Sequence, residues 1–245
     1  MKKRNWIIVI SVLLNIVLMA GLTQIVIQEN YCSKLLRRIS TFKNGPTPVY
    51  LLDWYRAIND SFSVYEGQKN VVMLGDSHTS MVNWSELLGR GDVASRGIER
   101  DITEGFIRRI NSIIDLKPKF CFIQGGLNDL YLGFSKEYII NNLQILIDTL
   151  YQNNIKSSLT TVTFVSKEKN GKMPINDKVK ELNELIFQLA KKNNIPLIDL
   201  NGKLSDGDYL GDEYSAPDGL HFSNKSYQFW KNTVLDILNI EQLLW

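Results

Sequence analysis

From residue 71 onward, short apolar runs alternate with longer segments whose apolar residues recur at helical spacing. The apolar runs lie at 71–74, 92–95, 120–123, 158–165 and 195–200. They are unbroken, which is typical of parallel strands covered on both faces. The helical segments lie at 80–88, 103–116, 136–153, 177–193 and 225–238. This alternation predicts an α/β fold: a three-layer α/β domain around a central parallel sheet of about five strands.

The N-terminus has a different pattern. Residues 6–27 carry no charge, and roughly 20 apolar residues suffice to span a bilayer. Small residues suited to signal-peptide cleavage occur only at Ala20 and Gly21, and the apolar run continues past them. For 1–27 we therefore favour an uncleaved transmembrane helix over a cleaved signal peptide. The basic tip KKR at 2–4 predicts a single-pass protein of the cell membrane with the rest of the chain extracytoplasmic.

Two further regions follow this predicted anchor. Residues 28–69 are interpreted as a connecting arm that contains one helix, in YLLDWYRAINDSF, and residues 70–245 as the main domain. The net charge of the chain is +2, and its basic excess lies at the N-terminal tip, so we expect no nucleic-acid partner. Cys32 and Cys121 are the only cysteines, and we expect neither a disulfide nor a metal site. The sequence sets no oligomeric state.

Serine and histidine chemistry stands at the two ends of the main domain. The first predicted strand runs into VVMLGDSHTS, which exposes Ser77 at a strand-to-helix turn. Near the C-terminus stands PDGLH, where Asp218 precedes His221 by three residues, a spacing at which a turn can bring the carboxylate to the imidazole. A hydroxyl becomes a good nucleophile when a base takes its proton, and a carboxylate orients that base. We therefore predict catalytic roles for Ser77, Asp218 and His221.

Two other predicted strand ends supply hydrogen-bond donors for a developing oxyanion. The second strand runs into SRGI, where the Gly97 amide has no side chain to shield it. The third runs into QGGLNDL, which places the Asn128 side chain at the corresponding level. Together with the amide of Ser77, these groups form a plausible three-donor oxyanion hole.

The blocks GDSHTS, SRGIERD, GGLND and DGLH, in this order, resemble the SGNH hydrolases, also called GDSL-type lipases and esterases. The resemblance runs from about Val71 to Trp230. It implies an α/β/α sandwich, no metal or organic cofactor, and ester hydrolysis through a covalent acyl-serine. It also implies that Ser77, Gly97, Asn128, Asp218 and His221 carry the family's roles.

One departure from the family pattern is His78, where the family usually carries an apolar residue. A structural role, capping the helix, is favoured over a place in the acyl pocket, and no carboxylate partner is evident. Asp76 and Asp129 are expected to hold loops through backbone amides. The run KEKNGK at 167–172 is interpreted as a solvated loop.

These observations predict a membrane-anchored serine esterase that removes small acyl groups, above all acetyl, from carbohydrate at the cell surface. A lysophospholipase or thioesterase acting on lipid is the alternative within the enzyme class. Acyl transfer to a sugar hydroxyl, and a non-catalytic glycan-binding module, remain as further alternatives. The expected partners are thus an acylated small molecule, glycan or lipid as substrate, and the membrane through the N-terminal helix.

Overall fold

The computed structural model describes Trp6, residues 47–65 and residues 67–243. The chain divides into two compact units, Met1–Thr47 and Pro48–Trp245, of which the second holds nearly all the described residues. No helix in this described part is long and apolar enough to cross a membrane. The predicted anchor, apart from Trp6, and Cys32 lie outside the described residues.

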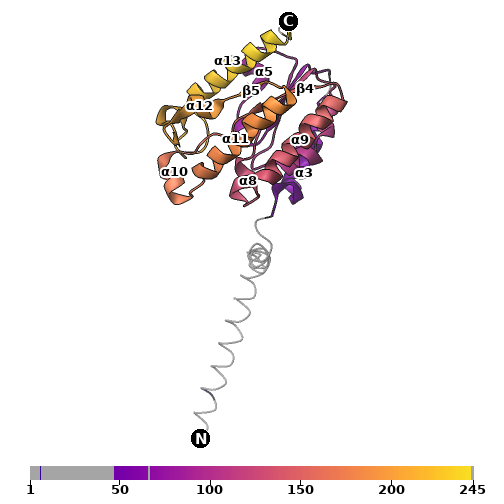
Figure 1. The fold of residues 1–245 in the computed structure, drawn as a ribbon. Coiled ribbons are helices and arrows are strands. Elements are labelled where there is room, and N and C mark those ends of the chain that lie inside the picture. Colours follow the sequence, from indigo (N-terminus) through magenta and orange to yellow (C-terminus); the bar gives the residue numbers. More distant parts are fainter. Residues whose placement is uncertain (1–5, 7–46, 66, 244–245) are drawn as a thin grey trace. The chain divides into compact units, whose positions relative to one another are not determined.

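A five-stranded parallel sheet forms the centre of the second unit, in the order β2-β1-β3-β4-β5 (Figure 1). The strands are β1 (Val71–Gly75), β2 (Val93–Gly97), β3 (Phe120–Gln124), β4 (Lys156–Thr160) and β5 (Leu197–Ile198). Every residue of β1 and β3 is buried, because helices cover both faces of the sheet. The predicted parallel sheet of about five strands is therefore confirmed.

Helices pack on both faces of this sheet. On one face lie α6 (Thr103–Arg108), α9 (Lys136–Gln152) and α11 (Asn176–Asn193); on the other lie α5 (Trp84–Leu88) and α13 (Asn224–Ile240). The rings of Trp84 and Trp230 meet edge to face between α5 and α13, with centroids 4.7 Å apart, and both are fully buried. The two helical layers and the sheet make the predicted α/β/α sandwich.

The predicted strand 158–165 is wrong at its second half. β4 ends at Thr160, and the residues after it turn toward α11 and α12 (Leu200–Leu204). The amides of Val162 and Val165 donate to the side-chain oxygens of Asn183 and Asn176 instead of to a neighbouring strand. Apolar periodicity cannot register this change, because the segment stays buried in either conformation.

Two predicted single helices are each broken. Of residues 80–88, only Trp84–Leu88 form a helix, α5, and Ser80 ends the separate helical turn α4 (Ser77–Ser80). Residues 103–116 contain two helices, α6 and α7 (Asn111–Ile114). The segment KEKNGK, predicted as a loop, is the helix α10 (Lys167–Lys172), because the hydroxyl of Ser166 caps its start by accepting the Lys169 amide. The remaining short elements are α8 (Leu127–Tyr131), β6 (Ser205–Asp206), β7 (Tyr209–Leu210) and the 3-10 turn η3 (Asp212–Tyr214).

The helix expected in the arm is α3 (Asp53–Ser61), between the 3-10 turns η1 (Val49–Leu51) and η2 (Phe62–Val64). It is anchored to the sheet domain by Tyr55, which is buried. The Tyr55 hydroxyl donates to the carboxylate of Asp101 at 3.0 Å and lies 3.3 Å from the carbonyl of Gly105. The arm helix thus belongs to the same compact unit as the sheet.

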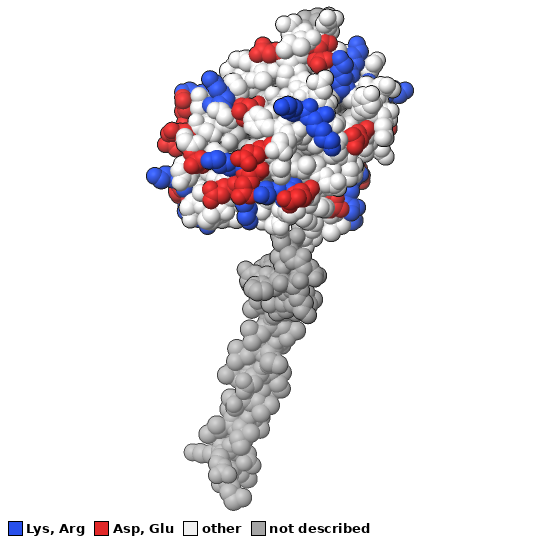
Figure 2. Space-filling view, viewed as in Figure 1, with Lys and Arg blue, Asp and Glu red and all other residues white. Residues whose placement is uncertain are grey.

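Acidic and basic side chains are interspersed over the face of the molecule seen in Figure 2. The viewed face has no extended area of one sign. Among the described residues, Lys136 pairs with Glu181 and Lys172 with Glu168. Exposed pairs of this kind contribute little to stability.

Candidate active site

The strand order places a topological switch point at β1. The next strand in the chain, β2, pairs with one edge of β1, and β3 pairs with the other edge. In open α/β sheets, ligands bind beyond the carboxyl ends of the strands at such a point. β1 ends at Gly75 and is followed by Asp76 and then Ser77, the first residue of α4. A Cβ at Gly75 would lie 2.1 Å from the Thr79 hydroxyl, so only glycine permits this turn. Ser77 remains partly exposed at the carboxyl end of β1.

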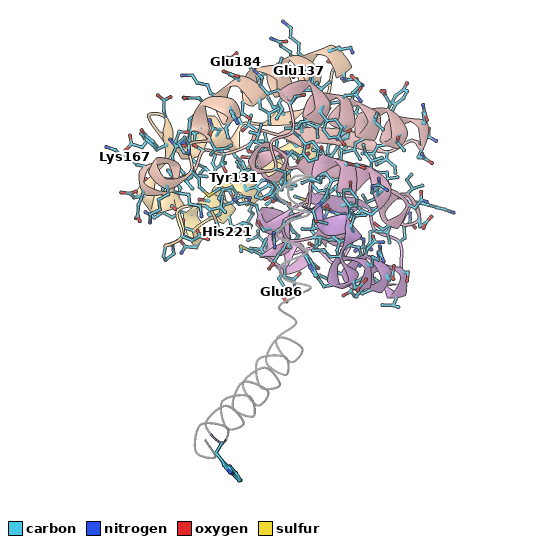
Figure 3. The ribbon with its side chains drawn as sticks, turned by 90° about the horizontal axis from the view of Figure 1, so that it is seen from below. Glu86, Tyr131, Glu137, Lys167, Glu184 and His221 are labelled. Atoms are coloured by element: carbon cyan, nitrogen blue, oxygen red, sulfur yellow. The ribbon has the colours of Figure 1, made fainter. Side chains whose placement is uncertain are left out.

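Residues 215–223, which connect η3 to α13, are called the histidine loop and carry Asp218 and His221. Figure 3 shows the position of His221. One Asp218 oxygen accepts the amides of Leu220 and His221, both at 3.0 Å, and the other lies 2.5 Å from His221 Nδ1. Partial burial by itself raises the pKa of Asp218, but the hydrogen bonds from His221 and Leu220 outweigh it and lower that pKa to about 2. Asp218 is therefore ionised throughout the physiological range.

Ser77 and His221 meet across 144 positions of the sequence. His221 Nε2 lies 3.0 Å from Ser77 Oγ, while Nδ1 faces Asp218. The three residues predicted for catalysis thus form one continuous chain of hydrogen bonds, in which a carboxylate orients an imidazole and the imidazole contacts a hydroxyl. This arrangement can remove the proton from the hydroxyl as it attacks an electrophile.

Gly97 lies at the end of β2, in register with Gly75 of β1. Its Cα packs against the backbone of α4, since a Cβ there would lie 2.4 Å from the amide nitrogen of Ser80. The glycine thus lets β2 approach the helix that begins with Ser77. Its proposed role as an amide donor requires this close approach.

Asn128 lies in α8, directly after β3, and its side chain is held in place by two acceptors. The side-chain nitrogen donates to the carbonyl of Asp101 at 2.9 Å and lies 3.4 Å from a carboxylate oxygen of Asp76. The second contact is at the weak end of the hydrogen-bond range. One N–H of Asn128 is therefore committed to Asp101, and the other is the one a substrate oxyanion can recruit.

The surroundings of His78 differ from those expected from the sequence. A carboxylate partner is present: Asp76 Oδ1 lies 3.3 Å from His78 Nδ1 and also accepts the His78 amide at 3.0 Å. His78 Nε2 lies 3.0 Å from the carbonyl oxygen of Leu220, and the side chain is 2% exposed. Burial works to lower the pKa of His78, but the bonds to Asp76 and Leu220 outweigh it and raise that pKa above the usual histidine value.

Both flanking aspartates hold loops, as expected from the sequence. Asp76 accepts the His78 amide, and Asp129 accepts the amide and hydroxyl of Thr103 at 3.1 and 2.5 Å. Burial raises the pKa of Asp129 to about 7, although the hydrogen bonds from Thr103 lower it in part.

Two buried residues behind the site were missed by sequence reasoning. Asp101 forms an ion pair with Arg109 at 2.8 Å, and Arg109 also donates to the carbonyl of Gly75 at 3.0 Å. Asp101 thereby connects the nucleophile turn with Asn128, whose side chain it accepts. Its place in the block SRGIERD was the available signal, but its partner Arg109 carries no motif.

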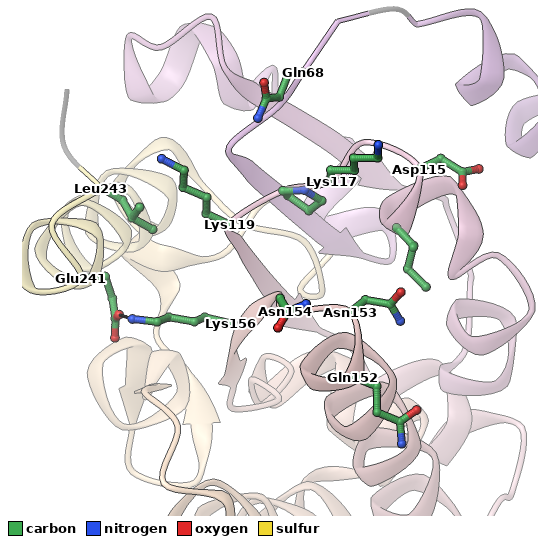
Figure 4. A pocket seen from close by; sticks show the side chains of 12 residues that line it. Gln68, Asp115, Lys117, Lys119, Gln152, Asn153, Asn154, Lys156, Glu241 and Leu243 are labelled. Carbon is green, nitrogen blue, oxygen red and sulfur yellow. Dashed lines mark hydrogen bonds and ion pairs between the residues drawn. The ribbon is translucent and has the colours of Figure 1, made fainter.

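A pocket of about 840 Å³ lies at the opposite end of the sheet (Figure 4). Its lining residues precede the strands: Gln68 comes before β1, Lys117 before β3 and Asn154 before β4. A smaller pocket, of about 600 Å³, flanks the histidine loop and is lined by Ser166, Lys167, Glu168, Asp212, Ser215, Ala216, Pro217 and Gly219. Within the described ranges, no group of three or more His, Cys, Asp or Glu side chains is placed to hold a metal ion.

Comparison with known proteins identifies the family of this chain. The family model described as GDSL-like lipase/acylhydrolase matches residues 60–229, more than half of the chain. Among solved structures, a GDSL-like lipase from Bacteroides thetaiotaomicron superposes with a TM-score of 0.68 at 21% identity, covering 77% of this chain and 98% of that one. An acetyl-xylooligosaccharide esterase from Geobacillus Stearmophilus gives 0.58 at 17% identity, with 71% and 94% covered. At these identities the two structures show a shared fold.

Curated relatives come from Streptococcus agalactiae and are named N-acylneuraminate cytidylyltransferase. The serotype V protein is 33% identical over 105 residues, which are 43% of this chain and 24% of that protein. The serotype III protein is 26% identical over 166 residues, 66% of this chain and 37% of that protein. The chain thus spans only 24% to 37% of the length of these relatives.

Proposed function

Because the chain belongs to the GDSL-like lipase/acylhydrolase family, whose members hydrolyse esters, we propose that it is a serine esterase acting through Ser77, His221 and Asp218. The observation that carries the proposal is the unbroken contact from Asp218 through His221 to Ser77, with 2.5 and 3.0 Å between the atoms involved. In that order, the three side chains are the orienting group, the base and the nucleophile that acyl transfer needs.

The reaction then proceeds in two halves. His221 Nε2 takes the proton of Ser77 Oγ as this oxygen attacks the ester carbonyl carbon, and the carbonyl oxygen becomes an oxyanion. The amides of Ser77 and Gly97 and the Asn128 N–H that faces Asp76 donate to that oxyanion. When the intermediate collapses, the C–O bond breaks and His221 returns the proton to the departing alcohol. Water repeats the sequence on the acyl-serine and releases the acid.

We propose a small acyl group, above all acetyl, carried by a carbohydrate. The pocket beside the histidine loop supports this choice, because its lining includes Pro217 and Gly219, the chain neighbours of Asp218, and five of its eight lining residues have polar or charged side chains. A hydroxyl-rich leaving group suits such a surface better than a lipid chain does. The acetyl-xylooligosaccharide esterase among the structural neighbours is consistent with it.

Among carbohydrates, an O-acetylated N-acylneuraminate is the first to test, because the curated relatives are named for that sugar. A neuraminate carries a carboxylate, and Lys167 in the polar pocket offers a cation of the matching charge. Lys167→Met should therefore raise KM for the acetylated neuraminate severalfold and leave KM for a neutral acetylated xylose oligomer unchanged. An equal change for both sugars would refute this recognition.

The decisive assay uses the full chain against aryl esters of increasing acyl length, with Ser77→Ala and the exposed-serine control Ser63→Ala in parallel. Hydrolysis concentrated on acetate, lost in Ser77→Ala and kept in Ser63→Ala, supports the proposal. A preference for long acyl chains would assign the activity to lipid instead. No turnover of any ester would leave acyl transfer or glycan binding without hydrolysis.

We further propose that residues 6–27 anchor the protein in the cell membrane with the esterase domain outside. Support comes from the uncharged apolar run and the basic residues before it. Carbonate extraction of membranes tests the anchor, and protease treatment of intact cells tests its orientation. Release of the protein by carbonate, or protection of the domain in intact cells, would contradict the respective half of this proposal.

A further inference from the structure

His78 is a fully buried imidazole directly beside the candidate nucleophile, and the reaction proposed above gives it no task. Its ring centroid lies 5.4 Å from that of His221 and 4.2 Å from the Phe222 ring. The imidazole that bonds Ser77 Oγ is that of His221, whereas the ring of His78 bonds Asp76 and Leu220. A polar ring is costly to bury unless its nitrogens are satisfied, so its partners indicate what it does.

Those partners come from both halves of the site. On the nucleophile turn, His78 Nδ1 lies 3.3 Å from Asp76 Oδ1. On the histidine loop, Nε2 lies 3.0 Å from the carbonyl of Leu220, 142 positions away. A carbonyl oxygen can only accept, so Nε2 must carry a proton and donate it. The proton on His78 Nε2 is therefore required by the loop that carries the catalytic base.

The bonded peptide of Leu220 is itself part of the catalytic loop. While its carbonyl accepts from His78, its amide donates to Asp218 Oδ1 at 3.0 Å. Asp76 extends the chain in the other direction, because its second oxygen lies 3.4 Å from the side-chain nitrogen of Asn128. The buried pair of Asp76 and His78, which belongs to the nucleophile turn, thus contacts both Asn128 and the histidine loop.

We propose that His78 is a positioning residue that holds the Asp218–His221 loop against the Ser77 turn through its bond to the Leu220 carbonyl. The 3.0 Å contact between His221 Nε2 and Ser77 Oγ joins two loops from distant parts of the chain. His78 supplies a second, buried connection between the same two loops, so it fixes their separation before substrate arrives.

The charged and titratable groups around His78 are few. Asp76 faces it from its own turn, Asp218 and His221 lie in the histidine loop, and the Tyr227 hydroxyl of α13 donates to the His78 carbonyl at 2.9 Å. Tyr227 gives a matched control, because Tyr227→Phe removes one buried hydrogen bond to the His78 backbone but leaves the contacts of the His78 ring in place.

The first test compares His78→Leu, His78→Gln and Tyr227→Phe in the full chain, in detergent, on an aryl acetate. It rests on the proposed esterase function. His78→Leu should lower kcat tenfold or more with KM within about twofold. His78→Gln should recover much of that loss, because its Nε2 is also three bonds from Cβ and can donate to the Leu220 carbonyl. The positioning role is refuted if His78→Leu retains full kcat, or if Tyr227→Phe loses as much.

A second test does not need activity, so it separates failure of this proposal from failure of the esterase. The chain has only two histidines, so long-range ¹H–¹⁵N spectra hold two imidazoles, which His78→Gln and His221→Gln assign. We expect His78 Nε2 to be protonated from pH 5 to 8. The His221 Nε2 resonance reports the contact with Ser77 Oγ that joins the two loops, so it should keep its position in Tyr227→Phe and move in His78→Leu. An unprotonated His78 Nε2, or an unchanged His221 Nε2 resonance in His78→Leu, would overturn the proposal.

Discussion

Asp218 contacts His221 twice: one carboxylate oxygen lies 2.5 Å from the ring nitrogen Nδ1, and the other accepts the backbone amide of the same residue at 3.0 Å. The carboxylate that orients the imidazole is therefore itself held by the backbone amide of the same histidine. Because the two are three positions apart, a single tight turn sets this geometry without help from the rest of the fold.

The pH dependence of the esterase should show a single acid limb. The pKa of Asp218 is lowered to about 2, so this carboxylate keeps its charge as pH falls until well below the range in which the enzyme is assayed. The base must be neutral to accept the Ser77 proton, so its protonation is the one event that should lower kcat/KM as pH falls, and the profile should level on the alkaline side. Measurement of kcat/KM on an aryl acetate from pH 4 to 9 checks this. A second acid limb, or a flat profile, would contradict it.

Asn128→Ala should remove one oxyanion donor and lower kcat by roughly a hundredfold, with a small change in KM. The reason is that the N–H facing Asp76 at 3.4 Å bonds more strongly to a developing negative charge than to its resting partner. Steady-state kinetics separate kcat from KM. A loss confined to KM would show that Asn128 binds the ground state and stabilises no oxyanion.

Gly97→Ala should destabilise the fold by about 1–3 kcal/mol and reduce activity, because the added Cβ would lie 2.4 Å from the Ser80 amide nitrogen and must push β2 away from α4. Gly91→Ala is the matched control, since a Cβ at Gly91 meets nothing within 4 Å. Urea unfolding and aryl acetate hydrolysis are measured on both. Equal stability of the two variants would show that α4 shifts freely and that the close approach is not required.

Tyr55→Phe should test the link between the arm helix and the site. The Tyr55 hydroxyl donates to Asp101, whose carbonyl holds Asn128. Loss of this buried bond to a carboxylate should cost about 1–3 kcal/mol of stability, with a smaller effect on kcat. Tyr151→Phe, on an exposed tyrosine of α9, is the control for urea unfolding. If both variants unfold at the same urea concentration, α3 contributes nothing through Tyr55.

The sequence predicted those features that depend on local pattern. The apolar runs of β1 and β3 identified the sheet because every residue in them is buried. Asp218 and His221 were found because their contact needs only a three-residue turn. The partner of Ser77 followed from the scarcity of histidines, and the structure places His221 Nε2 against its Oγ.

Features that depend on long-range contacts were not predictable in the same way. The end of β4 at Thr160 is set by asparagine side chains on α11, which no periodicity reveals. The partner of His78 is a backbone carbonyl 142 positions away, and every residue type carries the same carbonyl. Nearby, Asp76 was named as a loop-holding residue, but its contact with the His78 ring depends on the turn at Ser77.

Asp129 should make stability fall as pH rises through neutrality. Burial raises its pKa to about 7 in the folded protein, so the folded state keeps a proton that the unfolded chain releases near pH 4. The stabilising contribution is complete below the unfolded pKa and is lost as pH rises through the folded one, amounting to about 3 kcal/mol between pH 5 and 8. Asp129→Asn imitates the protonated form and should remove this part of the pH dependence in urea unfolding. Asp236→Asn, at an exposed position of α13, should leave it intact. Parallel stability curves for wild type and Asp129→Asn would mean that the hydrogen bonds from Thr103 keep the carboxylate ionised despite its burial.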